Sequence, residues 1–128
     1  TLEKLVEYKD HPEFMEDIVY NNNIKPDDIK RYDIPFRNVL LRNSGFKEKD
    51  VIPHLQSSLN YLYASKNPNM KNYIKNNFNI FWDYGYLSGQ DRITLNMIEA
   101  NPKEWDIANL LTNPIFSKQD KIRICQLV

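Results

Sequence analysis

Few side chains in this sequence are of the kinds that perform catalysis or hold metal ions. The two histidines, His11 and His54, lie far apart and share no spacing with a cysteine that would suggest zinc. The single cysteine, Cys125, stands among apolar residues, which predicts a buried and unreactive thiol. The three glycines are isolated, so the sequence has no glycine-rich phosphate loop. We therefore expect a non-enzymatic protein with no catalytic residues, no metal site and no cofactor.

Two Trp-Asp pairs are the most conspicuous side chains that could bind a partner. They are Trp82-Asp83 and Trp105-Asp106. One interpretation is a row of exposed residues that holds a peptide, because aromatic side chains dominate interface hot spots. The interpretation that we favour is structural. Each Trp fills a seam of the core, and each Asp lies in a first helical turn, where negative charge suits the helix dipole.

Tyrosines recur beside these pairs and are candidate partner-binding residues. Tyrosine has an apolar ring and a polar hydroxyl, a combination that is common at interfaces. The alternative is a tyrosine at the edge of the core with its hydroxyl in water. The candidate residues are Tyr61, Tyr63, Tyr84 and Tyr86.

Basic residues gather on the expected second helices of the last three repeats and form a second candidate surface. Aligned lysines and arginines could contact phosphates and give salt-sensitive binding of nucleic acid. The chain as a whole has 17 basic and 17 acidic residues, so no global field attracts nucleic acid or an anionic membrane. The candidate basic edge consists of Lys71, Lys75, Arg92, Lys118, Lys121 and Arg123.

A phrase that repeats every 23 residues predicts how these side chains are positioned. The segments 59–70, 82–93 and 105–116 are in register, and each begins a pair of short helical patterns. A fixed period of this length indicates small units that bury their apolar faces only by stacking. We expect an all-α fold, an α-solenoid of about five two-helix repeats in one domain, residues 1–128. An N-terminal cap helix at 1–12 would precede repeats at about 13–34, 35–57, 58–80, 81–103 and 104–128.

Equivalent apolar positions then predict the core, and polar residues predict the helix ends. We expect Asn before Pro, as at Asn67 and Asn113, to end helices in the left-handed conformation. Ser117 and Asp120 resemble a capping box, and Pro53 should end or kink a helix over 47–55. The expected core positions are Phe14, Phe36, Leu59, Trp82 and Trp105, then Ala64, Leu87 and Leu110, then Met70, Ile93 and Phe116.

The repeated phrase resembles a known family. The pattern W-D-x-x-x-L-S-x-N-P-x-I recurs in large families of uncharacterised proteins from giant DNA viruses of the mimivirus kind. Residues 58–117 carry the resemblance, although Leu59-Asn60 replaces Trp-Asp and Gln90-Asp91 replaces Asn-Pro. The pattern is also loosely similar to variant leucine-rich repeats. The resemblance implies a helical repeat array in the host cytoplasm or the virion, and the family offers no catalytic residues to carry over.

These observations favour protein–protein interaction or scaffolding as the function. The apolar and charged fractions, 41% and 27%, are those of a soluble protein, and no apolar run could span a membrane. Two alternatives stay open, a virion or assembly subunit and a nucleic-acid-binding protein that uses the basic edge. We expect a protein partner, and we expect uncovered solenoid ends to permit self-association. The chain starts without Met, which suggests a trimmed chain or a piece of a longer protein.

Overall fold

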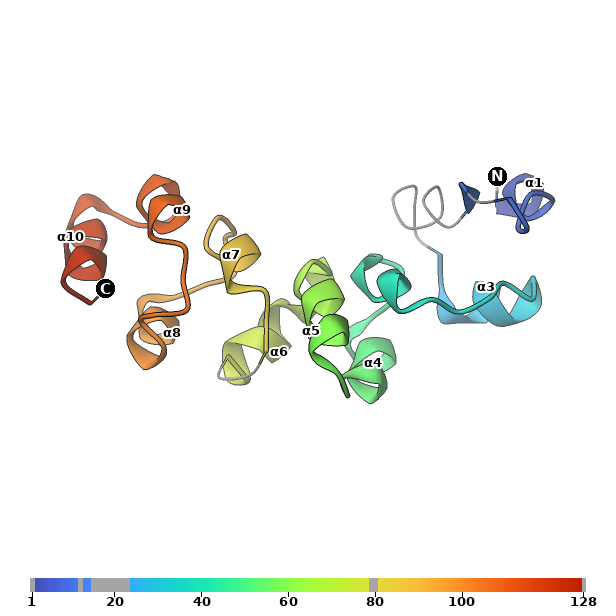
Figure 1. The fold of residues 1–128 in the computed structure, drawn as a ribbon, viewed down its shortest axis with the longest axis horizontal. Coiled ribbons are helices and arrows are strands. Elements are labelled where there is room, and N and C mark those ends of the chain that lie inside the picture. The colour runs from blue at the N-terminus through green and yellow to red at the C-terminus, as the bar shows by residue number, and fades with distance from the viewer. Residues whose placement is uncertain (1, 12, 15–23, 79–80, 128) are drawn as a thin grey trace. The chain divides into compact units, whose positions relative to one another are not determined.

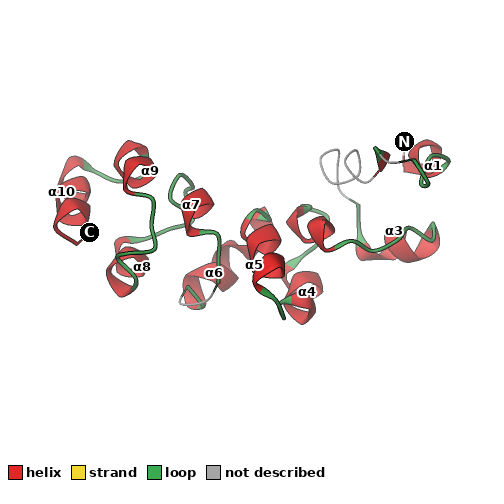
Figure 2. Ribbon diagram, in the orientation of Figure 1, coloured by secondary structure: helices red, strands yellow, loops and turns green. Residues whose placement is uncertain are grey.

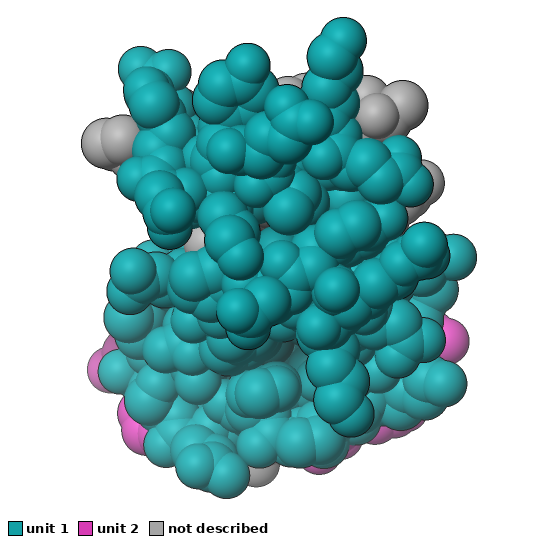
Figure 3. Space-filling model, turned by 90° about the vertical axis from the view of Figure 1, so that its right-hand side faces the viewer, with its two compact units in different colours: residues 1–70 teal, residues 71–128 magenta. Residues whose placement is uncertain are grey.

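The computed structural model of the chain describes residues 2–11, 13–14, 24–78 and 81–127. These residues form short helices joined by turns and contain no strand (Figures 1 and 2). The prediction of an all-α fold is therefore confirmed for this part of the chain. The chain divides into two compact units, which we call unit 1 (Thr1–Met70) and unit 2 (Lys71–Val128) (Figure 3).

Unit 1 is built from helices of one or two turns. The longest α-helix among the described residues of this unit, α5, packs on the 3₁₀ turn Asn38–Arg42. The α-helices that the structure describes in unit 1 are α1 (Leu2–Val6), α3 (Pro26–Arg31), α4 (Glu48–Val51) and α5 (Ser58–Ser65). Its 3₁₀ turns are Asn38–Arg42, Ile52–His54 and Pro68–Met70.

The described residues of unit 2 form five α-helices, and α10 packs on both α8 and α9. These helices are α6 (Lys71–Asn76), α7 (Tyr84–Leu87), α8 (Leu95–Ala100), α9 (Ile107–Thr112) and α10 (Lys118–Leu127). All are shorter than the roughly 12 residues at which an isolated helix becomes marginally stable. Tertiary packing therefore has to hold them.

Each unit has its own apolar core. Most positions that the repeat predicts to be equivalent share deep burial: Ala64, Leu87 and Leu110 are inaccessible to solvent. Met70 is fully buried, and Ile93 and Phe116 are nearly so. Other fully buried side chains are Leu40, Leu41 and Val51 in unit 1, and Ile74, Ile98 and Ile124 in unit 2.

Helix starts follow the capping chemistry of the sequence. Asp83 accepts a hydrogen bond from the backbone N–H of Tyr86 at 3.0 Å, and Asp106 accepts one from Asn109 at 3.1 Å. Both aspartates are thus N-caps that precede their helices, one position earlier than the first-turn location we expected. The capping box at α10 is confirmed, since Ser117 and Asp120 exchange hydrogen bonds of 3.1 and 3.2 Å.

Two expected core positions are wrong. Leu59 is 50% exposed and Phe36 is 39% exposed. The reason at Leu59 is the start of α5, where Ser57 is the N-cap and accepts a hydrogen bond from the N–H of Asn60. The helix therefore begins before Leu59, whereas α7 and α9 begin after their Trp-Asp pairs. The shift turns Leu59 to solvent.

The expected left-handed asparagines are also wrong. Asn113 ends α9 with φ −73° and ψ 119°, an extended conformation. Among the described residues Asp33, at φ 50°, is the only non-glycine with a positive φ. Pro68 starts a 3₁₀ turn, and Pro53 lies inside another, which follows α4 directly. The α-helix does end at Val51, just before Pro53, as expected, and the chain continues as the 3₁₀ turn Ile52–His54.

One predicted repeat lies partly outside the residues that the structure describes. Residues 15–23 of the expected repeat 13–34 lie outside the described residues. Cys125 does lie in the described part, in α10. It is exposed, so the prediction of a buried thiol is wrong.

Candidate functional site

A buried asparagine side chain in unit 1 binds three backbone carbonyls far back in the sequence. The Nδ2 amide of Asn67 donates to the carbonyl oxygens of Leu41, Asn43 and Phe46 at 2.9, 3.0 and 2.9 Å. Its Oδ1 accepts from the N–H of Asn69 at 2.9 Å. An amide has only two N–H donors, so the three carbonyls share them. Asn67 is fully buried and fixes the turn that follows Asn38–Arg42.

The same arrangement occurs in unit 2 at Asn113. Its Nδ2 donates to the carbonyl oxygens of Ser88 and Gln90 at 2.9 and 2.8 Å. Its Oδ1 accepts from the N–H of Ile115 at 3.1 Å. Ser88 makes a further link, because its hydroxyl accepts from the N–H of Asp106 at 3.0 Å. We call Asn67 and Asn113 the two clamp asparagines, since each binds a turn that precedes it by more than twenty residues.

Both tryptophans of the Trp-Asp pairs are buried, which agrees with the structural interpretation and not with an exposed row. Trp82 donates from Nε1 to the carbonyl oxygen of Asn77 at 2.7 Å, and Tyr73 meets its ring edge-on at 5.9 Å. Trp105 is 7% exposed. Among the described residues its Nε1 has no hydrogen-bond partner.

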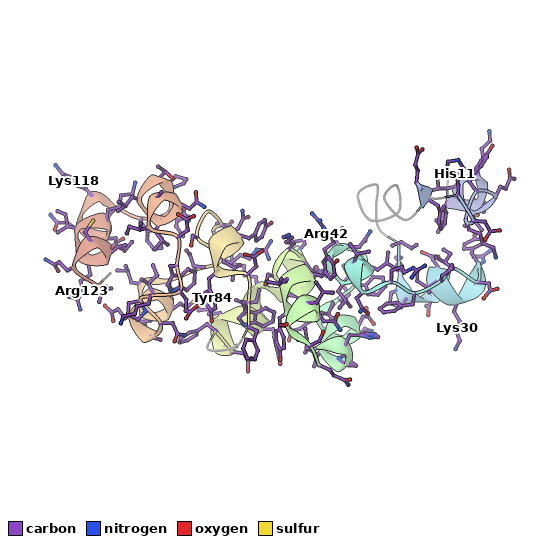
Figure 4. The ribbon with its side chains drawn as sticks, viewed as in Figure 1. His11, Lys30, Arg42, Tyr84, Lys118 and Arg123 are labelled. Carbon is purple, nitrogen blue, oxygen red and sulfur yellow. The ribbon has the colours of Figure 1, made fainter. Side chains whose placement is uncertain are left out.

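Tyr84 is tied into the core of unit 2. Its ring meets that of Trp105 edge-on at 4.9 Å, and its hydroxyl donates to the carbonyl oxygen of Phe78. Burial, and secondarily the negative charge of Glu104, raises the pKa of Tyr84 above its usual value. Tyr84 (Figure 4) thus has both a packing partner and a hydrogen-bond acceptor within unit 2.

The other candidate tyrosines are half-buried and do not form a single row. Tyr61 and Tyr63 lie on α5, and residues two apart on a helix point to different sides. Tyr86 lies on α7 beneath the guanidinium of Arg92, which is 5.8 Å from the ring centre.

The six residues of the candidate basic edge have different environments. Arg92 is only 8% exposed, so it does not belong on an exposed edge. Arg123 pairs with Glu99 at 3.5 Å. Lys118 extends outward from α10 (Figure 4), and Lys71 and Lys75 on α6 are also exposed. Lys121 is half-buried. The exposed positive charge on α6 and α10 therefore comes mainly from lysines.

One face of α5 exposes apolar side chains. Leu59 is 50% exposed and Leu62 is 38% exposed, and half-buried Tyr63 lies on the same face, since the three are spaced i, i+3, i+4. We call these three residues the α5 stripe. Contiguous exposed apolar groups of this kind mark interaction surfaces more often than isolated ones do.

Two adjoining open cavities lie between α3 and α4 in unit 1. One of about 370 Å³ has a mainly apolar lining, and the other of about 500 Å³ has lysines around it. Pro26, Lys49 and Asp50 line both cavities. We call the combined feature the α3–α4 groove. The sequence analysis did not identify it.

No group of three His, Cys, Asp or Glu side chains in the described residues could hold a metal ion. His54 stacks on Phe36 with ring centres 4.8 Å apart. His11 accepts from the backbone N–H of Glu13 at 3.5 Å. Each histidine thus has a local structural role. None of the helices in the described ranges is both long enough and apolar enough to cross a lipid bilayer.

The groove and the clamp asparagines left only weak signals in the sequence. Asn67 follows Asn43 by 24 residues and Asn113 follows Asn67 by 46, close to one and two periods of the repeat, and this could have indicated a shared side-chain role. The groove carries the Lys-x-x-Asp pattern twice, at Lys25–Asp28 and Lys47–Asp50. Compared with known proteins, the chain matches no family model, no curated protein and no solved structure.

Proposed function

We propose that the chain is a non-enzymatic scaffold for protein–protein interaction, built as an α-solenoid of two-helix repeats with a period of about 23 residues. The two clamp asparagines support this arrangement. Asn67 and Asn113 stand at the same position of the repeat that the sequence predicts, and each binds carbonyls in the turn that the prediction assigns to the preceding repeat. Stacking of this kind leaves the outer side chains of successive repeats free to form a binding surface.

The observation that carries the proposed function is the α5 stripe. Exposing Leu59 and Leu62 to water is unfavourable by about 25 cal/mol per Å² of apolar surface, and binding a partner would recover part of that free energy. The adjacent ring of Tyr63 adds a residue type that is enriched at interface hot spots.

Photo-cross-linking in the cells that make the protein tests this function. A benzophenone amino acid would replace Leu62 in one variant and Ile122 in another. Ile122 is the matched control, because it is an apolar residue on α10 that is 46% exposed, somewhat more than the 38% of Leu62. We expect a discrete cross-linked partner from position 62 and none from position 122. Equal cross-linking from both, or none from either, would count against the α5 stripe.

The resemblance to giant-virus repeats supports a viral origin and a place in the host cytoplasm or the virion, and we keep both as part of the proposal. A virion or assembly subunit is the structural variant of the same scaffold. Size-exclusion chromatography over a wide concentration range separates the two, because a subunit that assembles through its ends elutes earlier as concentration rises.

A further inference from the structure

The α3–α4 groove combines an apolar recess with a positively charged margin. The recess is lined by the rings of Pro26 and Pro53, by Ile29 and by the partly exposed Phe36. His54 already stacks on Phe36 at an interplanar angle of 21°, so the stacked ring supports Phe36 from one side. Proline rings carry no backbone N–H, and the recess therefore suits an apolar side chain.

The charged part of the groove carries three exposed lysines, Lys25, Lys47 and Lys49. Two carboxylates, Asp27 and Asp50, lie among them. The Oδ2 of Asp50 accepts a hydrogen bond of 3.0 Å from the backbone N–H of Lys47, which fixes the position of this carboxylate and leaves its charge in place. The margin thus has a modest surplus of positive charge, with ammonium groups able to meet carboxylates.

The pattern favours a peptide over a nucleic acid. A phosphate backbone carries a charge at every nucleotide, and Asp27 and Asp50 would oppose it. A peptide can place single carboxylates opposite the lysines and one apolar side chain in the recess. A cavity of about 370 Å³ has ample room for one large side chain.

We propose that the α3–α4 groove binds a segment of a partner protein that carries one large apolar side chain flanked by acidic residues. This inference rests on the proposed interaction function and names a partner class for it. Lys25 and Lys49 meet the acidic residues, and the recess beside Phe36 takes the apolar side chain.

Fluorescence anisotropy tests the proposal with a fluorescein-labelled peptide that has a central phenylalanine flanked by glutamates. The variants are Lys25→Glu and Lys49→Glu. Lys30→Glu is the matched control, because Lys30 is an exposed lysine on α3 itself and lines neither cavity (Figure 4). Reversing a charge in the groove should weaken binding about tenfold or more, whereas Lys30→Glu should stay within about twofold of the parent chain. Circular dichroism confirms that each variant is folded.

Two further probes identify what the groove recognises. A peptide with serine in place of the phenylalanine should lose most of its affinity, and so should one with lysines in place of the glutamates. Absence of peptide binding, equal binding by all three variants, or tighter binding of an oligo-dT strand than of the peptide would overturn the proposal. A cross-link from α5 without peptide binding here would remove only this inference and would leave the proposed function standing.

Discussion

Asn113→Ala should be one of the most destabilising polar substitutions in unit 2. The amide that it removes donates to the carbonyl oxygens of Ser88 and Gln90, and its oxygen accepts from Ile115. A buried polar group left without a partner costs about 1–3 kcal/mol. Two carbonyls lose their donor, and water entry relieves part of the cost. We therefore expect a loss of about 2–4 kcal/mol in the free energy of unfolding.

Urea unfolding followed by tryptophan fluorescence measures this loss. Both tryptophans of the chain, Trp82 and Trp105, lie in unit 2 and report on its unfolding. Asn109→Ala is the matched control. Asn109 makes one exposed side-chain hydrogen bond of 3.5 Å, to Gly85, and alanine is the better helix former. The control should change stability by less than about 0.5 kcal/mol. If Asn113→Ala costs no more than the control, the clamp does not hold the turn.

Asn113→Asp separates hydrogen bonding from side-chain size. It keeps the shape and the acceptor for Ile115 but turns an acceptor toward the two carbonyls. At neutral pH it should be at least as destabilising as Asn113→Ala. The carbonyls raise the pKa of the introduced carboxyl above its unfolded value of about 3.9. Stability is therefore highest below that unfolded pKa and is lost as the pH rises through the raised folded pKa. Stability that does not depend on pH would contradict the assigned bonds.

Three further predictions concern unit 2. Trp105→Ala should destabilise by about 3–5 kcal/mol because the indole is buried, and a thermal melt checks this; an unchanged melting temperature would place Trp105 on the surface. Burial raises the pKa of Tyr84, so its contribution to stability is complete below pH ~10 and is lost as the pH rises through the folded pKa. The Tyr84→Phe variant should accordingly lose less stability than the parent chain between pH 9 and 11, as measured by urea unfolding at each pH. If the lysines of α6 bind nucleic acid, Lys71→Glu with Lys75→Glu should lower both the affinity for DNA and its dependence on salt; no affinity of the parent chain at low salt would exclude that function.

The period of the sequence predicts the helices and much of the core because both depend on local pattern. Ala64, Leu87 and Leu110 are buried as predicted, since a recurring apolar position needs only a helix and a neighbour to cover it. Helix boundaries were less accurate. The prediction that Leu59 is buried was wrong because Ser57, a residue outside the repeated phrase, is a good N-cap and starts α5 earlier.

The clamp asparagines show what a local reading misses. An asparagine before proline is typical of a helix end, and the sequence analysis assigned Asn67 and Asn113 a backbone role. In the structure their side chains bind distant backbone carbonyls instead. In unit 1 the amide of Asn67 donates to carbonyls that lie 21 to 26 residues earlier in the sequence. Which distant carbonyls need a donor depends on how the turns come together, and no local pattern contains that information.

The groove was missed for a similar reason. Its apolar part is lined by Ile29, from the predicted repeat 13–34, and by Phe36 and His54, from the next predicted repeat, 35–57. The sequence analysis assigned Phe36 to the core and so did not expect its aromatic ring to line a surface recess. The two Lys-x-x-Asp patterns were visible, but a lysine next to the start of a helix is ordinarily solvated.

Hydrogen exchange of asparagine side-chain amides, followed by NMR, tests the clamps most directly. The Nδ2 protons of Asn67 and Asn113 should exchange far more slowly than those of Asn96 and Asn109, which belong to exposed residues. Equal exchange rates at all four asparagines would contradict the account, because buried amides bonded to two or three backbone carbonyls cannot be as open to water as amides on the surface.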